Sequence, residues 1–504
     1  MIAGPTDRGI TRLAALVEEG RARARATGRG VLVSLAEPAP GTAPLALLTH
    51  ARGATSGTLA TAAREATLYW ERPAERVALT GIGTTASLTA AGQDRFATLD
   101  RAWLTLRDGA VIDDPSNGAP GVGPTLMGGF AFEPDGPRDT AWRDFPAALL
   151  VLPRILVATI GDDCWITTTL RIDADGRPDL STDEVTTLRA QALAAGARPL
   201  PPASDPGAQL TYSDARPAAE WRALVESTTA AIRSGAMEKV VLARTVHATT
   251  TRDLDATAAI RHLRDAFPST HVFGIWRGDR AFVGATPERL VRLEGDAVRS
   301  SSLAGSIGRG AGASEDATRI AALLASAKDR AEHEMVRRDL CAGLAELCED
   351  VTAASEPSIL TLPHVHHLHT PVTARLRPGR TLLGLLERLH PTPAVGGTPR
   401  ATALGFIREN EGMDRGWYAA PVGWLGRTQG EFAVALRSGV IAGREAWLFA
   451  GCGVVADSEA GSEYEESMLK LRPMQLALST AGRRDAAADP VAPRLAAAGG
   501  HANR

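Results

Sequence analysis

The order in which strand-like and helix-like segments follow one another is the feature that most constrains the fold of this chain. Runs rich in β-branched and other apolar residues, which favour strands, cover residues 30–35, 149–152, 155–158, 239–244, 281–284, 432–436 and 447–450. Helices are predicted from Asp214 to a stop at Gly235, and over about 314–349 and 462–478. Strands therefore do not alternate regularly with helices, which favours an α+β fold with large antiparallel sheets over a doubly wound one.

Composition and charge argue against several classes of protein. The 504 residues carry a formal net charge of -3 and no basic stripe, so no nucleic-acid partner is expected. No run approaches the ~18 apolar residues of a membrane span, and the first residues lack the charged-then-apolar pattern of a signal peptide. The four cysteines form no C-x-x-C pair, which argues against a disulfide framework or a zinc site. We expect a soluble cytoplasmic protein without a membrane partner.

The length of the chain would allow about three domains, but large sheet-based folds often form one unit. A Pro-rich segment over 199–207 is predicted to be a linker, and the Ala-, Arg- and Pro-rich residues from 480 a disordered tail. The expected division is an N-terminal segment over 1–210, a catalytic region over 211–479 and a tail over 480–504.

Two pairs of acidic residues stand three positions apart within predicted helices, so each pair shares one helix face. They are Asp329 with Glu332, and Glu463 with Glu466. Such acids are commonly solvated residues that make i,i+4 salt bridges, as Glu466 could with Lys470. Glu332 fits this less well, because it heads an apolar helix face and would need a partner. The other interpretation is that the two acid pairs converge on one Mg²⁺ ion, which prefers oxygen ligands. Spacing alone leaves both interpretations open.

A series of short motifs in the second half of the chain resembles one enzyme family. The motifs are EKVVLAR at 238–244, GATPERL at 284–290, LAGS at 303–306, KDRAEH at 328–333, HLHTP at 367–371, LHPTPAVGG at 389–397, GWY at 416–418, FAVALR at 432–437, GCGVV at 451–455 and EYEE at 463–466. In this order, over about 221–470, they resemble the chorismate-utilising enzymes, which include isochorismate, salicylate, anthranilate and aminodeoxychorismate synthases. The resemblance implies two large facing antiparallel β-sheets flanked by helices, with the N-terminal segment adding strands to the same body.

The resemblance implies catalytic roles for two residues. Lys239 would be the base that activates the water attacking C2 of chorismate, and Glu288 the acid that protonates the departing C4 hydroxyl. The same residues could instead be a strand-edge lysine turned to solvent and a salt bridge between Glu288 and Arg289. Glu332 and Glu466 resemble the Mg²⁺ ligands of the family, with Asp329 and Glu463 acting through waters.

The resemblance also implies a substrate pocket. Arg437 would clamp the enolpyruvyl carboxylate, and strand alternation predicts Ala433 and Ala435 on its face, with Leu436 on the core face. His367 would lie beside the reacting C4 region. The expected substrate-binding residues are Gly305, Ser306, His367, Ala394, Tyr418, Arg437, Gly451, Cys452, Gly453 and Lys470.

Two alanines favour an isochorismate synthase within the family. Ala304 stands where aminodeoxychorismate synthases tend to carry lysine, and Ala394 where ammonia-using and salicylate-forming members typically carry threonine. The chain has no G-x-C-x-G nucleophile elbow, so no glutaminase is expected. The alternative is a salicylate synthase, which also eliminates pyruvate. A non-catalytic chorismate-binding relative is disfavoured, because Lys239, Glu288 and the acid pairs are all present. Either a monomer or a homodimer, in either a menaquinone or a siderophore pathway, fits the sequence.

Overall fold

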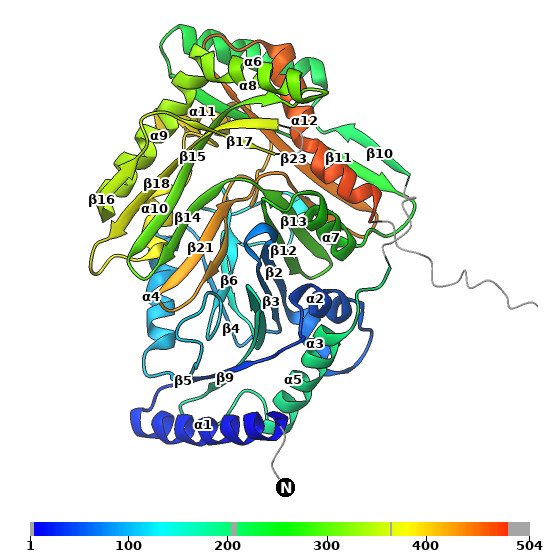
Figure 1. Cartoon of the computed structure of the whole chain (residues 1–504), viewed down its shortest axis with the longest axis vertical. Helices are drawn as coiled ribbons and strands as arrows, with labels where there is room; N and C mark the ends of the chain where they lie inside the picture. The colour runs from blue at the N-terminus through cyan, green and yellow to red at the C-terminus, as the bar shows by residue number, and fades with distance from the viewer. Residues whose placement is uncertain (1–4, 203–208, 363–364, 482–504) are drawn as a thin grey trace, which may run out of the picture.

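The computed structural model describes residues 5–202, 209–362 and 365–481. The strands of these residues form two sheets (Figure 1). The 13-stranded sheet runs in the order β10 (Leu210–Asp214), β11 (Lys239–Thr250), β23 (Glu445–Val454), β22 (Ser438–Ala442), β13 (Arg280–Thr286), β12 (His271–Arg277), β2 (Thr67–Arg72), β3 (Val77–Ile82), β8 (Ile155–Ile160), β9 (Asp163–Ile172), β1 (Val31–Pro38) and β5 (Val111–Asp113), with β19 (Gly397–Thr398) against β11. The 10-stranded sheet runs β16 (Cys348–Ala353), β18 (Val365–Leu376), β15 (Ala297–Gly308), β14 (Arg289–Glu294), β21 (Gln429–Val434), β20 (Pro421–Leu425), β6 (Leu126–Phe130), β7 (Ala148–Leu152) and β4 (Ala86–Ala90), with β17 (Ser358–Thr361) against β18.

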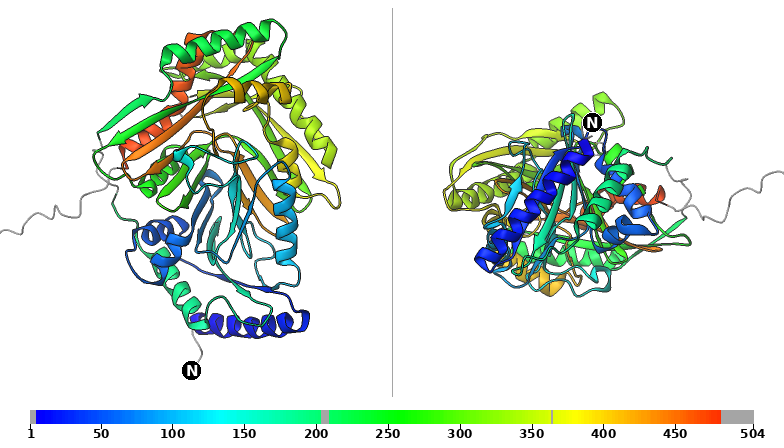
Figure 2. Two further views of the ribbon diagram at one scale, coloured as in Figure 1. Left: turned by 180° about the vertical axis from the view of Figure 1, so that it is seen from behind. Right: turned by 90° about the horizontal axis from the view of Figure 1, so that it is seen from below.

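Helices flank both sheets (Figures 1 and 2). They are α1 (Pro5–Thr27), α2 (Pro44–Gly53), α3 (Gly57–Glu65), α4 (Arg95–Arg107), α5 (Thr182–Ala197), α6 (Ala218–Arg233), α7 (Ala256–Ala266), α8 (Ala313–Ala325), α9 (Ala327–Leu347), α10 (Leu382–Leu389), α11 (Arg400–Asn410) and α12 (Ala460–Ser479), with short 3-10 turns η1 (Pro73–Glu75) and η2 (Thr140–Trp142). Figure 1 places α1 at one end of the molecule and α6, α8 and α12 at the other. Within the described residues, no helix is long and apolar enough to cross a membrane.

Most neighbouring strands pair antiparallel, whereas β1 and β5 run parallel. The architecture is therefore the predicted α+β arrangement of two large antiparallel sheets flanked by helices. Strands β1 to β9 are divided between the two sheets, and β2 pairs directly with β12. The N-terminal segment thus completes the same sheets as the rest of the chain. The division at about residue 210 stays a prediction, and the expected tail falls on 482–504, outside the described residues.

The main core fills the space between the sheets. Trp70 and Leu242 come from the larger sheet and Leu150 and Phe432 from the smaller one, and all four are buried in one apolar cluster. Gly81 in β3 leaves room for its neighbours, because a Cβ there would lie 2.6 Å from Cγ of Pro153 and 3.3 Å from the sulfur of Met127 in the other sheet. Burial of these large side chains is the main stabilising contribution of the two-sheet arrangement.

Several details of the helices differ from the sequence prediction. The predicted helix over 314–349 is two helices, because Ser326 ends α8 and caps α9 by accepting a hydrogen bond from the N–H of Asp329. The last helix, predicted over about 462–478, begins two residues earlier, at Ala460. The helices that were not predicted are α1 to α5, α7, α10 and α11.

Candidate active site

One cavity collects nearly all of the residues that the sequence assigns to the site. It lies where β23, β15 and β18 meet the first turns of α9 and α12. Its lining comprises Val241, Pro287, Glu288, Leu303, Ala304, Gly305, Ser306, Lys328, Asp329, Glu332, His367, Ala394, Val395, Arg415, Tyr418, Ala419, Leu436, Arg437, Phe449, Ala450, Gly451, Cys452, Gly453, Glu463, Glu466 and Lys470. An adjoining hollow shares Ser306, Arg437, Glu466 and Lys470 and is also lined by exposed residues of α12, so the cavity continues toward the surface there.

Glu288 lies in the turn between β13 and β14 and enters the cavity. Its N–H donates to the Thr286 hydroxyl at 3.2 Å, and its carbonyl accepts from the N–H of Val434 at 3.0 Å, which fixes the turn. Burial raises the pKa of the Glu288 carboxyl to about 7, although the charges of Lys239 and Lys470 oppose this rise. The alternative salt bridge to Arg289 is wrong, because Arg289 pairs with other acids. Glu288 is therefore suited to hold and release a proton near neutral pH.

Lys239, the first residue of β11, lies just behind the cavity wall. Its side chain is fully buried, and its ammonium group lies 2.7 Å from Oε1 of Glu332. The alternative of a strand-edge lysine turned to solvent is therefore wrong. A buried lysine close to a cavity can act as a general base only as the neutral amine, so the ammonium group, which donates to Glu332, must first lose a proton before Nζ can accept one.

Gly453 in β23 leaves the room in which this ion pair sits. A Cβ at this position would lie 2.9 Å from Oε1 of Glu332 and 2.9 Å from Cε of Lys239. Both atoms belong to the far ends of flexible side chains, so a methyl group would displace the pair at little cost to the fold. Glycine at this position is therefore required by the site.

Gly453→Ala is expected to lower kcat about tenfold or more, because the displaced Lys239 and Glu332 no longer lie in their working positions. The melting temperature is expected to change little. Gly461→Ala is the matched control, since a Cβ there meets nothing within 4 Å. Steady-state kinetics and thermal melts of both variants check this, and an unchanged kcat in Gly453→Ala contradicts the assigned geometry.

Three of the four acids expected to serve a metal are paired with lysines. Glu332 pairs with Lys239 at 2.7 Å, Glu466 with Lys470 at 2.7 Å, and Glu463 with Lys328 at 3.4 Å. The interpretation of all these acids as solvated first-turn residues is wrong for Glu463, which is 4% exposed. Lys328 was quoted within a motif but was given no role, and its position next to Asp329 was the signal that could have found it.

The electrostatics of these acids fit a divalent cation. Burial, followed by the charge of Glu466, raises the pKa of Glu463. Burial and the nearby Glu332 and Glu466 also raise the pKa of Asp329. Their oxygens are the hard ligands that Mg²⁺ takes, and a bound cation would relieve this repulsion. In the described part of the chain, however, no group of three or more His, Cys, Asp or Glu side chains is already gathered closely enough to hold an ion. The acids fit Mg²⁺ in kind and charge, and binding would require small side-chain movements.

Arg437 stands at a corner of the backbone rather than on a strand. β21 ends at Val434 and β22 begins at Ser438, and Arg437 adopts a positive φ of 48° between them. Non-glycine residues rarely adopt this conformation, and it is concentrated at functional sites. The predicted alternation is therefore wrong at its end, because Leu436 lines the cavity beside Arg437 and the two alanines do not.

His367 connects Arg437 to β15. One guanidinium nitrogen of Arg437 donates to Nε2 of His367 at 3.2 Å, and Nδ1 lies 2.7 Å from the Ser306 hydroxyl. Arginine can only donate, so Nε2 accepts and the proton of the neutral ring is on Nδ1. Burial, with the charges of Arg437 and Lys470, lowers the pKa of His367 well below its usual value. Burial lowers the pKa of Arg437 to about 10, so the guanidinium stays charged and can bind a carboxylate.

The remaining wall combines close glycines with buried polar groups. Lys470 donates to the carbonyl oxygen of Gly451 at 2.9 Å. The ring of Tyr418 stacks on Phe449, and burial raises its pKa to about 12. Gly305 has a φ of 75°, a conformation that favours glycine. The sequence interpretation missed Arg415, a buried lining residue that pairs with Glu411 and donates to two backbone carbonyls.

Comparison with known proteins agrees with this geometry. The sequence model of the family described as chorismate binding enzyme matches residues 19–479. The chain belongs to this family. It is similar to the salicylate biosynthesis isochorismate synthase of Pseudomonas aeruginosa, at 41% identity over 83% of this chain and 86% of that protein. The isochorismate synthase MenF of Bacillus subtilis is 33% identical over 81% of this chain and 87% of that protein.

Solved structures of chorismate-binding enzymes and their relatives share the fold. MenF, the menaquinone-specific isochorismate synthase of Escherichia coli, superposes with a TM-score of 0.71 at 24% identity, over 92% of this chain and 99% of that one. Anthranilate synthase component I from Streptococcus pneumoniae TIGR4 gives a TM-score of 0.65 at 22% identity, over 79% of this chain and 92% of that one. The family and fold inferred from the motifs are confirmed, whereas the roles of individual residues stay predictions.

Proposed function

We propose that this chorismate-binding enzyme is an isochorismate synthase that depends on Mg²⁺. The observation that carries the proposal is Glu288, a buried carboxyl group inside the cavity whose pKa is raised to about 7. Two relatives that match more than four-fifths of the chain, at 83% and 81%, are isochorismate synthases. Ala394, where salicylate-forming members typically carry threonine, lies on the cavity wall and favours this activity over theirs.

Water enters at C2 of chorismate, the ring double bond shifts, and the C4 hydroxyl departs as water. Lys239 accepts the proton of the attacking water, and Glu288 donates a proton to the departing oxygen. Solvent then returns both groups to their starting states, so the reaction is an isomerisation with no net consumption of water. The acid and the base would act on opposite faces of the ring.

The two carboxylates of chorismate need separate positive partners. Arg437 is suited to the enolpyruvyl carboxylate, because His367 and Ser306 hold its guanidinium in place. Glu332 and Glu466 would hold Mg²⁺ directly, with Asp329 and Glu463 through waters. Bound there, the ion would supply positive charge for the ring carboxylate.

The product formed from chorismate tests the proposal. Purified protein with chorismate and Mg²⁺, without ammonia, is expected to give isochorismate in equilibrium with chorismate, as followed by chromatography. Release of pyruvate with salicylate would identify a salicylate synthase instead. A requirement for ammonia would indicate an amino-transferring enzyme, and binding of chorismate without turnover would indicate a non-catalytic relative.

Glu332→Gln is expected to raise the Mg²⁺ concentration needed for half-maximal activity about 10- to 100-fold, because a neutral amide replaces a charged ligand. A titration of activity against Mg²⁺ measures this. Glu334→Gln is the matched control, since Glu334 lies on the same helix and pairs with Arg337 at the surface. Equal Mg²⁺ responses in the two variants would place the metal elsewhere.

A further inference from the structure

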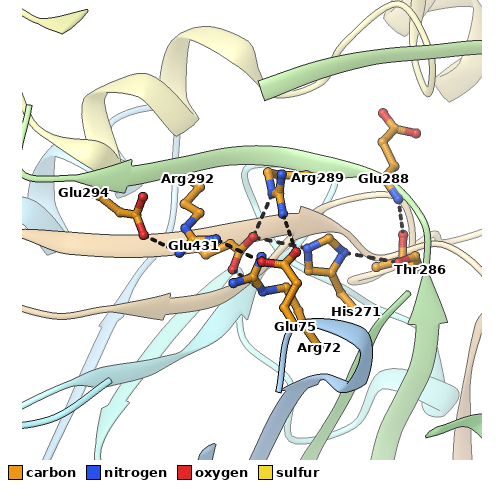
Figure 3. Close-up of polar contacts among 9 residues, drawn as sticks. All are labelled: Arg72, Glu75, His271, Thr286, Glu288, Arg289, Arg292, Glu294 and Glu431. Carbon is orange, nitrogen blue, oxygen red and sulfur yellow. Dashed lines mark hydrogen bonds and ion pairs between the residues drawn. The ribbon is translucent and has the colours of Figure 1, made fainter. Parts of the chain in front are cut away.

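A fully buried carboxylate lies beneath the turn that carries Glu288. Glu431 of β21 is 0% exposed, and three positively charged or polar groups surround it. Nε of Arg289 donates to its Oε1 at 2.7 Å, Nε2 of His271 lies 3.2 Å from the same oxygen, and Nε of Arg72 lies 3.1 Å from Oε2. We call Arg72, His271, Arg289 and Glu431 the Glu431 cluster (Figure 3).

The Glu431 cluster contacts both ends of the turn that carries Glu288. Arg289 follows Glu288 directly, and at the other end Nδ1 of His271 lies 3.3 Å from the carbonyl oxygen of Thr286. Between these contacts, Glu288 points away from the cluster and toward the cavity, as Figure 3 shows. The cluster therefore holds Thr286 and Arg289, and these two residues determine where the Glu288 carboxyl lies.

One member of the cluster comes from the N-terminal segment. Arg72 ends β2, which pairs with β12, the strand of His271. Glu75, in the 3-10 turn η1 that follows β2, is exposed and pairs with Arg289 at 3.2 Å. The N-terminal segment thus contributes contacts that support the Glu288 turn, in addition to completing the sheets.

The charge of Glu431 persists despite its burial. Burial alone would raise its pKa, but the hydrogen bond and charge of His271 and the charges of Arg72 and Arg289 lower it well below its usual range. A buried ionic cluster of this kind adds little stability compared with apolar packing of the same volume, because each charge loses its hydration. Its directional contacts can instead specify geometry. The same cluster also engages the guanidinium of Arg289, the residue that follows Glu288.

We propose that Glu431 is a positioning residue for Glu288, acting through Arg289 and His271, and that Arg72 of the N-terminal segment completes this support. The inference rests on the proposed function, because it gives Glu288 the role of proton donor. None of the four cluster residues lines the cavity, so within the described residues they act on the reaction through the turn and not through substrate.

Glu431→Gln tests the proposal, because it keeps the shape of the side chain and removes its charge. We expect kcat to fall about 10- to 100-fold while the KM for chorismate changes less than about threefold, since the misplaced proton donor does not hold the substrate carboxylates. Arg289→Lys keeps the charge but loses the planar fork, and about a tenfold loss of kcat with the same KM is expected. Glu294→Gln is the matched control: Glu294 pairs with Arg292 on the same strand, outside the cluster, and its kcat should stay at the wild-type value.

Each outcome supports or overturns the proposal. A kcat loss in both cluster variants, absent in the control, supports it. A wild-type kcat in folded Glu431→Gln, or losses of kcat and substrate affinity in parallel, would overturn it. If Glu431→Gln does not fold, as judged by circular dichroism, Arg289→Lys decides alone by the same criteria. Wild-type protein that does not convert chorismate would instead overturn the proposed function, and with it the role of Glu288.

Discussion

Glu288→Gln is expected to lower kcat about 10²- to 10⁴-fold, the usual contribution of a positioned general acid. Glutamine keeps the size of the side chain and its place in the cavity but has no proton to give. Substrate affinity, measured by isothermal titration with chorismate, is expected to change little, because Arg437 and Lys470 belong to other elements. Glu294→Gln makes the same chemical change on the neighbouring strand β14, outside the cavity, and should leave kcat unaltered.

The pH dependence of turnover gives a second view of the same residue. Burial raises the pKa of Glu288 from the ordinary glutamate range to about 7. The acid must be protonated to act, and this pKa is that of the free enzyme, so kcat/KM is expected to fall as pH rises through about 7, with a slope of one proton. The residual activity of Glu288→Gln should lack this descent. A wild-type pH profile that stays flat from about pH 6 to about pH 8.5 would contradict the assignment.

Lys239→Met is expected to remove turnover to a similar extent, about 10²-fold or more, because methionine fills the buried space but cannot accept a proton. It also leaves Glu332 without its 2.7 Å partner, so some loss of stability is expected from an unpaired buried acid. Chorismate binding should persist, since Nζ lies behind the cavity wall. Rapid-quench product analysis and thermal melts separate the chemical effect from the structural one.

Lys328→Met is the comparison for this prediction. Lys328 also pairs with a buried acid of the site, Glu463, but has no assigned part in proton transfer. We expect it to lower kcat less than about tenfold while changing the Mg²⁺ response, because its acid partner is proposed to serve the metal. Equal losses of kcat in Lys239→Met and Lys328→Met would mean that Lys239 acts only as a counter-charge.

The strands of the catalytic region were predictable from local sequence because their β-branched runs are bounded by clear turns. Residues 281–284 lie within β13 and residues 447–450 within β23, as expected. The break at Ser326 was missed because helical spacing continues on both sides of it, so only the side-chain cap reveals the boundary. In α1, Leu13, Leu16 and Val17 are buried at helical spacing, a signal that was present in the sequence but was not used.

The site was predictable as a set of residues but not as a geometry. The motifs identified the cavity lining, because each motif contributes side chains from one strand or turn. Spacing indicated the pair of Glu466 with Lys470, which are four residues apart. It could not reveal that lysines neutralise Glu332 and Glu463, since those partners lie on different elements. The contact of Arg72 with Glu431 was likewise hidden, because it joins residues from opposite ends of the chain.

The pairing of β11 with β23 has a consequence for how the protein is made. Val240 lies opposite Val454, and α12, which follows β23, supplies Glu463, Glu466 and Lys470. During synthesis, the pocket therefore cannot close until almost the whole described chain has left the ribosome. Contacts between such distant segments form slowly, because long loops must close first. A chain that lacks α12 would have no complete pocket, so substrate could not stabilise it before α12 has been made.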